Sequence, residues 1–210
     1  MGSSLKKISK VSTSPKSYNN KYGVPLSLFN IDQKDQYGVL EIGMDKKGEI
    51  DTLSKIIQPD VSVITNINYA HAKNFSNIRQ IALAKSEIIY NTKNNGFIVL
   101  NADDQFFNLH KKITLKRNLK FLSFSIKKKD SNVKLIDIKK AGKKFKAIIR
   151  INNLRTHFFI SNDFQNNIQN ILATLTVMSI FLDISKINKN MFANFKTPEG
   201  RGDIDRKSTR

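Results

Sequence analysis

Residues 37–90 read YGVLEIGMDKKGEIDTLSKIIQPDVSVITNINYAHAKNFSNIRQIALAKSEIIY, and this stretch decides the fold. Two mostly apolar runs within it, at 39–44 and 61–67, have the length of β-strands. Such runs are typical of strands buried on both faces of a parallel sheet. Between them, residues 47–58 repeat apolar side chains at helical spacing until Pro59 ends the segment. The order strand, helix, strand predicts an α/β fold.

The rest of the chain continues this alternation, which predicts a parallel sheet flanked by helices on both faces. Residues 131–160 differ, because short alternating segments separated by Gly142 and by residues 152–153 predict a small antiparallel β-insert. The other expected elements are a loop or a short strand at 10–13, strands at 97–104 and 120–126, and helices at 26–30, 76–91, 107–114, 165–182 and 184–196.

One lysine lies on the apolar side of the helix that follows the second strand. At 3.6 residues per turn, Lys85 falls between Ile81 and Ile89 on a single apolar stripe. Lysine is almost never fully buried without a partner, so this position needs an explanation. The next two residues, Ser86 and Glu87, are expected to point away from the stripe.

Polar residues gather where the expected strands end. Glu41 lies late in the first of these strands, residues 66–71 follow the second, and residues 101–104 follow the third. In parallel sheets, ligands bind beyond the carboxyl ends of the strands. We therefore expect the three clusters to form one site.

The composition of the 210-residue chain allows a core, because 40% of its residues are hydrophobic. The chain has no cysteine, which excludes disulfides and thiolate chemistry. No apolar run is long enough to cross a bilayer, and the first residues lack the apolar region of a signal peptide. We therefore expect no membrane insertion and a cytoplasmic location.

The formal net charge of +19 suggests an anionic partner such as a nucleotide or a nucleic acid. Most of the excess is lysine, and asparagine and isoleucine are also abundant, a combination that AT-rich coding sequence favours. The segments KFLSFSIKKK and GKKFKAIIRI come closest to basic residues interleaved with aromatic ones, but the lysines are scattered elsewhere, so no nucleic acid partner is expected. A basic nucleic-acid-binding module is the alternative from another functional class.

Six segments, taken in order, resemble the central domain of the Mur ligase family, MurF type. They are SPKSYNNKYGVPLSL, EIGMDKKGEI, NYAHAKNFSNIRQIALAKSEI, NGFIVLNADD, NNIQNILAT and PEGRGDI. The resemblance implies a P-loop NTPase-like α/β domain over residues 1–203, with a tail at 204–210. It also implies an ATP-dependent ligase of peptidoglycan precursor synthesis that adds D-alanyl-D-alanine to UDP-N-acetylmuramoyl-tripeptide through an acyl phosphate. ATP and Mg²⁺ would be its cofactors, and the full-length form would be a monomer.

The resemblance also assigns roles to individual residues. Glu41 and His71 match the family's magnesium ligands, and Lys85 matches a lysine that becomes carbamylated and holds a second Mg²⁺. Burial favours this chemistry, because CO₂ adds to a neutral amine and burial lowers the pKa of a lysine. A lysine that extends past its apolar neighbours into solvent is the structural alternative for Lys85. His110 and His157 are expected to be hydrogen-bonded loop residues.

Further matches concern the nucleotide and the peptide substrate. The nucleotide-binding matches are Asn101, Asp103, Asn167, Asn170 and Arg201, and the substrate-binding matches are Asn19 and Asn20. Helix capping is the alternative for Asn167 and Asn170, and a turn is the alternative for Asn19 and Asn20. Asn166 stands where the family usually has a histidine.

The sequence departs from the family at the phosphate-binding loop, since it contains no G-K-T or G-K-S. MGSSLKK resembles only the edges of that motif. We therefore expect a central domain that is incomplete at its N-terminus, with an uncovered sheet edge, poor solubility and no ligase activity of the chain alone. A non-catalytic remnant of a Mur ligase is a further alternative.

Overall fold

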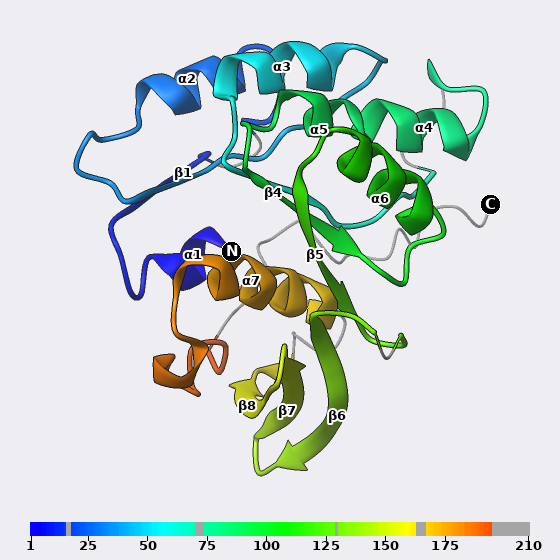
Figure 1. The fold of residues 1–210 in the computed structure, drawn as a ribbon. Coiled ribbons are helices and arrows are strands. Elements are labelled where there is room, and N and C mark those ends of the chain that lie inside the picture. The colour runs from blue at the N-terminus through cyan, green and yellow to red at the C-terminus, as the bar shows by residue number, and fades with distance from the viewer. Residues whose placement is uncertain (16–17, 70–73, 129, 163–166, 195–210) are drawn as a thin grey trace, which may run out of the picture.

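The computed structural model describes residues 1–15, 18–69, 74–128, 130–162 and 167–194. Its strands form a two-stranded and a six-stranded sheet (Figure 1). The smaller sheet pairs β1 (Val11–Thr13) and β2 (Tyr37–Val39) in parallel. The larger sheet has the order β3 (Val61–Ile64), β4 (Phe97–Asn101), β5 (Lys120–Ser125), β6 (Val133–Ala141), β7 (Lys144–Ile151) and β8 (Leu154–Ile160).

The helices lie between and around these strands. In chain order they are α1 (Gly2–Leu5), α2 (Gly23–Phe29), α3 (Glu49–Ile57), α4 (Ile78–Lys85), α5 (Glu87–Asn91), α6 (Phe107–Lys116) and α7 (Ile168–Phe181). Within the described residues, none of the helices is both long enough and apolar enough to cross a membrane.

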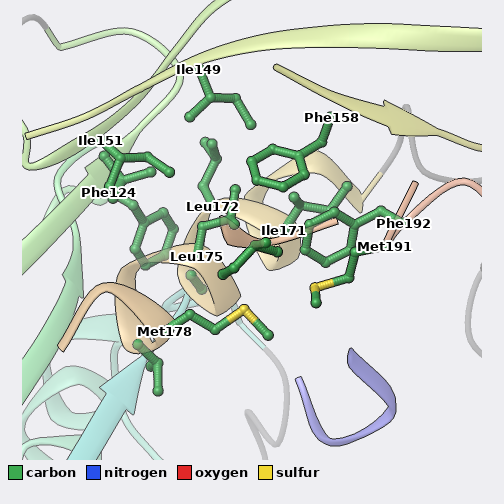
Figure 2. Packing of buried hydrophobic residues seen from close by; sticks show 14 of the residues in the cluster. Phe124, Ile149, Ile151, Phe158, Ile171, Leu172, Leu175, Met178, Met191 and Phe192 are labelled. Atoms are coloured by element: carbon green, nitrogen blue, oxygen red, sulfur yellow. The ribbon is translucent and has the colours of Figure 1, made fainter. Parts of the chain in front are cut away.

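Helices cover both faces of the six-stranded sheet, which confirms the predicted α/β architecture. On one face α7 contacts β4, β5 and β6, and its buried side chains pack with Phe124 (Figure 2). On the other face α4, α5 and α6 enclose a second core. Because successive side chains of a strand alternate between faces, Val99 belongs to the first core whereas Ile98 and Leu100 belong to the second.

The predicted antiparallel insert is confirmed, and it continues the main sheet. β6 begins in parallel with β5, where Val133 pairs with Phe124, and then runs antiparallel to β7. A register shift between Leu135 and Asp137 interrupts the β6–β7 pairing. Bulges of this kind bend a strand. The three antiparallel strands therefore extend the sheet beneath α7 rather than forming a separate unit.

The expected strand at 39–44 is wrong in its position and in its burial. The strand covers Tyr37–Val39, and both of these end residues are only half-buried. Beyond it the backbone bonds to loops instead of to a neighbouring strand. The amide of Glu41 donates to the Ser14 Oγ at 3.2 Å, and the amide of Gly43 donates to the Asn19 carbonyl at 2.7 Å.

The expected helix at 76–91 is instead two helices that meet at Ser86. The Ser86 side chain is buried and donates to the Leu83 carbonyl at 2.6 Å, so the expectation that Ser86 points away from the core is wrong. The Ile89 amide then donates to the Ser86 carbonyl at 2.9 Å, an i to i+3 bond that tightens the turn. Lys85 is therefore the last residue of α4.

The expected helix at 184–196 is also wrong over its described part. A single 3₁₀ turn, Ile184–Lys186, is followed by non-helical chain that packs along β8. There the Phe159 amide donates to the Lys189 carbonyl at 2.8 Å, and Ile160 bridges to Phe192. The Asn188 side chain accepts from the Asn190 amide at 2.8 Å, a local turn that competes with helix formation.

Candidate functional site

A polar cluster lies beyond the carboxyl ends of β3 and β4. The Lys85 Nζ donates to the Asn66 carbonyl at 2.9 Å, and the Asn101 Nδ2 donates to the Asn66 Oδ1 at 2.7 Å. The Asp104 Oδ2 accepts from the Ile67 amide at 2.9 Å. The structure thus brings the Asn66 and Asn101 segments and Lys85 together, as the rule for parallel sheets predicts.

The surroundings of Lys85 favour its neutral amine. Burial lowers the pKa of Lys85, and the negative charge of Asp104 only partly opposes this. A neutral amine is nucleophilic, whereas the ammonium form is not. The helical phase in the sequence therefore identified a lysine that is desolvated and held by a backbone carbonyl.

His110 lies close to the same cluster from α6. Its ring is buried, and its Nε2 lies 3.0 Å from the Ala82 carbonyl, one turn before Lys85. Burial lowers the pKa of His110, while the Ala82 carbonyl and Asp104 oppose that shift. The predicted hydrogen-bonded role fits this geometry, but the expected loop position is wrong, because His110 belongs to α6. His157 lies on β8, edge-on to the Phe159 ring.

Glu41 lies on a second, more exposed segment after β2. The Asn19 Nδ2 donates to the Glu41 Oε1 at 3.4 Å. Gly43 allows this approach, because a Cβ at that position would lie 3.1 Å from the Asn19 Cγ. The structure thus places Asn19 beside Glu41. The Asn20 Oδ1 accepts from the amides of Tyr22 and Gly23, at 3.0 and 2.9 Å, which is the turn alternative for that residue.

Glu87, the first residue of α5, connects that helix to the start of α3. Its Oε1 accepts from the Gly48 amide at 2.9 Å, and its Oε2 accepts from the Asp51 amide at 3.1 Å. These amides belong to the first turn of α3, where a negative charge is favourable. Gly48 has a φ of 89°, a conformation that favours glycine. Sequence reasoning missed this contact, because no local pattern reveals a cap supplied by another helix.

The two residues expected near the nucleotide after β4 are engaged with the protein itself. The Asp103 carboxylate accepts from the Ser125 Oγ and the Ile126 amide, each at 2.6 Å. Burial opposes ionisation of Asp103, but these bonds and those from the amides of Lys127 and Lys128 leave its pKa lowered. The Asn101 Oδ1 accepts from the Asp103 amide at 3.0 Å. Both side chains therefore shape the loops of the site.

Several expected residues remain outside the described part of the chain or at its borders. His71, Asn166 and Arg201 lie outside the described residues. Asn167 directly precedes α7 and is half-buried, and Asn170 is exposed one turn later.

The described residues provide part of a ligand set for the implied Mg²⁺. The Glu41 carboxylate is exposed and supplies the hard oxygen atoms that Mg²⁺ prefers, whereas Lys85 would become a ligand only as a carbamate. Among the residues that the structure describes, no three His, Asp or Glu side chains are grouped closely enough to hold a metal ion. The described residues therefore offer Mg²⁺ one ligand directly, the Glu41 carboxylate, and a second one only if Lys85 is carbamylated.

The first residues do not form a phosphate-binding loop. The amides of Ser4 and Leu5 donate to the Met1 carbonyl at 2.9 and 3.1 Å, which places them inside α1. Amides used within a helix cannot also cradle a phosphate.

A family model for the Mur ligase middle domain matches residues 1–178. A UDP-N-acetylmuramoyl-tripeptide–D-alanyl-D-alanine ligase from Rickettsia prowazekii is 31% identical over 193 residues, which covers 89% of this chain and 42% of the relative. The ligase of the same name from Buchnera aphidicola subsp. Acyrthosiphon pisum is 41% identical over 123 residues, 56% of this chain and 27% of that protein.

Solved structures of MurF resemble the fold. MurF from Acinetobacter baumannii superposes with a TM-score of 0.85 at 25% identity, over 95% of this chain and 43% of that one. MurF from Thermotoga maritima in complex with ADP gives a TM-score of 0.80 at 28% identity, over 93% of this chain and 44% of that one. The chain therefore spans less than half the length of these relatives.

Proposed function

The chain belongs to the Mur ligase family, and from this premise we propose that it supplies the ATP-binding middle domain of a MurF-type ligase, over residues 1–203. The proposed reaction joins D-alanyl-D-alanine to UDP-N-acetylmuramoyl-tripeptide through an acyl phosphate. The relatives that are named as ligases of this reaction are more than twice as long as the region that matches this chain. The complete reaction is therefore proposed for this chain.

One observation carries this proposal, namely a desolvated Lys85 whose Nζ is held 2.9 Å from the Asn66 carbonyl. The neutral amine attacks CO₂, a nitrogen–carbon bond forms, and one proton leaves to solvent. The product is a carbamate anion with two oxygen atoms. This change converts a poor metal ligand into a carboxylate-like one, which suits Mg²⁺.

Glu41 and His71 are proposed as the other protein ligands of the metal. Asn19 orients the Glu41 carboxylate, and Glu87 holds the start of α3 against α5, the helix that begins two residues after Lys85. Bound Mg²⁺ would neutralise the phosphate charges of ATP.

The residues at the start of α7 are proposed for the nucleotide. Asn167 and Asn170 would approach the adenine, and Arg201 would approach the phosphates. Asn101 and Asp103 would act indirectly, because their side chains fix the loops after β3, β4 and β5. Asn20 would support the substrate side by starting α2.

The test uses ¹³C NMR of the protein in ¹³C-labelled bicarbonate with Mg²⁺. We expect a carbamate resonance that disappears in Lys85→Met and persists in Lys112→Met, a matched change at an exposed lysine of α6. Absence of the resonance from the wild type, or its survival in Lys85→Met, would contradict the proposal.

A further inference from the structure

The antiparallel strands β6, β7 and β8 have a second face that the proposed ligase chemistry does not use. On β7, the buried residues Ala147, Ile149 and Ile151 belong to the core that α7 covers. Figure 2 shows Ile149 and Ile151 in this core. The alternate residues Lys146 and Arg150 are only half-buried and therefore belong to the opposite face.

Strand pairing gathers basic side chains on this opposite face. Arg150 on β7 pairs with Lys134 on β6 and with Arg155 on β8. Lys146 on β7 pairs with Lys139 on β6. Side chains paired in this way have their Cβ atoms about 4.5–5.5 Å apart, and like charges placed opposite each other are destabilising. We call these five residues the basic face.

Among the described residues, the acidic residues at the basic face include Asp137, within the strand pairing, and Asp130, which lines a pocket together with Arg150. Asp137 is the one acidic residue that the described strand pairing places there, and its Oδ2 lies 3.7 Å from the Lys139 Nζ. Both side chains are largely exposed, so this ion pair contributes little. The Arg150 guanidinium donates to the Ser131 carbonyl at 2.9 Å, which positions the group.

Two aromatic rings follow Arg155 on the same face of β8, at every second residue. The ring centroids of His157 and Phe159 are 5.6 Å apart, and Phe159 pairs directly with Lys146. Burial lowers the pKa of His157, and the charges of Lys146 and Lys189 add to this shift. A neutral imidazole and a phenyl ring beside cationic rows form a surface on which planar bases can stack.

The basic face consists of two rows across the strands, one with Lys134, Arg150 and Arg155 and one with Lys139 and Lys146. The distance between the two rows indicates the class of partner. Lys146 and Arg150 are four residues apart on β7, a rise of about 14 Å along an antiparallel strand. A single phosphate group cannot contact both rows, whereas a flexible phosphodiester chain can. We propose that the basic face binds single-stranded nucleic acid, with phosphates against the two cationic rows and bases against His157 and Phe159.

The expectation of no nucleic acid partner rests on lysines that are scattered outside the segments KFLSFSIKKK and GKKFKAIIRI. Strand pairing removes that reason, because residues as distant in sequence as Lys134 and Arg155 become neighbours across one strand. Register, rather than sequence density, creates the patch.

The test measures fluorescence anisotropy of a labelled single-stranded RNA of about 16 nucleotides with the full 210-residue chain, over a range of salt concentrations. We compare the double variant Lys139→Glu/Arg155→Glu with Lys112→Glu/Lys116→Glu on α6. All four residues are exposed, and both variants lower the net charge equally. We expect the first variant to weaken binding about tenfold or more and to reduce the salt slope by about 1.4. The second should weaken binding less than about threefold.

A second variant tests the aromatic part. Phe159→Leu keeps the charge and should weaken binding about fivefold, because one stacking surface is lost. Far-ultraviolet circular dichroism and thermal unfolding confirm that each variant is folded.

Several outcomes overturn the proposal. Equal loss in both charge-reversal variants would show that the overall charge, and not this face, binds RNA. Tighter binding to duplex DNA or to vesicles of anionic phospholipid than to the single strand would assign the face to another partner. No binding of the wild type near physiological salt would exclude the interaction.

Discussion

The Lys85 side and the Glu41 side of the proposed site differ in construction. Lys85 ends a helix that packs on the six-stranded sheet, where its neighbour Ile81 is 1% exposed and Asn101 is 3% exposed. Glu41 follows a separate two-stranded sheet, and its exposed carboxylate is contacted by Asn19 at 3.4 Å. One side is fixed by packing and the other by hydrogen bonds between loops. The Lys85 side should therefore dominate stability, and the Glu41 side should adapt more readily to a ligand.

The largest expected loss of stability follows from removing a side chain that packs beside Lys85. Ile81→Ala should lower the free energy of unfolding by about 2–5 kcal/mol, because it leaves a cavity in a closed core. Leu83→Ala on the same helix is the control, since Leu83 is 42% exposed and should change stability by less than about 0.5 kcal/mol. Urea unfolding of both variants measures the difference. Similar losses would show that α4 is not anchored as described.

The contact that joins the two sides should have the next largest effect. Glu87→Ala leaves the Gly48 and Asp51 amides without their carboxylate and should cost about 1–2 kcal/mol of unfolding free energy. It should also weaken Mn²⁺ binding, measured by electron paramagnetic resonance, because the start of α3, which follows the Glu41 segment in the chain, loses its bonds to α5, the helix that follows Lys85.

Asn91→Ala provides the matched control for Glu87. Asn91 lies on the same helix and also bonds to α3, through the Asp51 Oδ1 and the Ser54 Oγ at 2.9 Å each, but it does not contact Gly48. This variant should lose stability without a change in metal affinity. If both variants weaken Mn²⁺ binding equally, Glu87 acts only through general stability.

A pH titration tests the buried environment on the Lys85 side. The pKa of His110 in the folded protein is lowered from 6.5, chiefly by burial. As the pH falls below about 6.5, the unfolded chain therefore takes up a proton that the folded protein does not bind, and stability decreases. One such group changes the unfolding free energy by at most about 1.4 kcal/mol per pH unit. His110→Gln should remove this part of the decline between pH 7 and 5 in urea unfolding, and an unchanged slope would contradict it.

The difference between segments held by packing and segments held by hydrogen bonds also explains which elements the sequence predicted. Periodicity predicted β3, β4, β5 and the helices on both faces, because burial imposes a regular pattern on residues that pack on a sheet. It failed at residues 40–44 and at Ser86, where hydrogen bonds from distant segments set the conformation. Apolar pattern alone does not encode such bonds.

In the candidate site, too, apolar pattern revealed one residue and did not reveal the hydrogen bonds from distant segments. Helical phase singled out Lys85 because a charged residue on an apolar stripe is visible in the sequence. Its acceptor, the Asn66 carbonyl, is a backbone atom and leaves no pattern. The contribution of Glu87 was also hidden, because it caps a helix that lies 36 residues away in sequence. Sequence reasoning therefore found the reactive group and missed the contacts that position it.

The smallest expected loss of stability is on the Glu41 side of the proposed site. Asn19→Ala removes an exposed side-chain bond of 3.4 Å, while the backbone bond from the Gly43 amide to the Asn19 carbonyl can persist. We expect a stability change below about 0.5 kcal/mol, measured by urea unfolding. Gly43→Ala is the informative contrast, because its new Cβ would lie 3.1 Å from the Asn19 Cγ and push that side chain aside. If Asn19→Ala cost as much as Glu87→Ala, the Glu41 side would be as firmly built as the Lys85 side, and the division of the site into a packed and an adaptable half would be wrong.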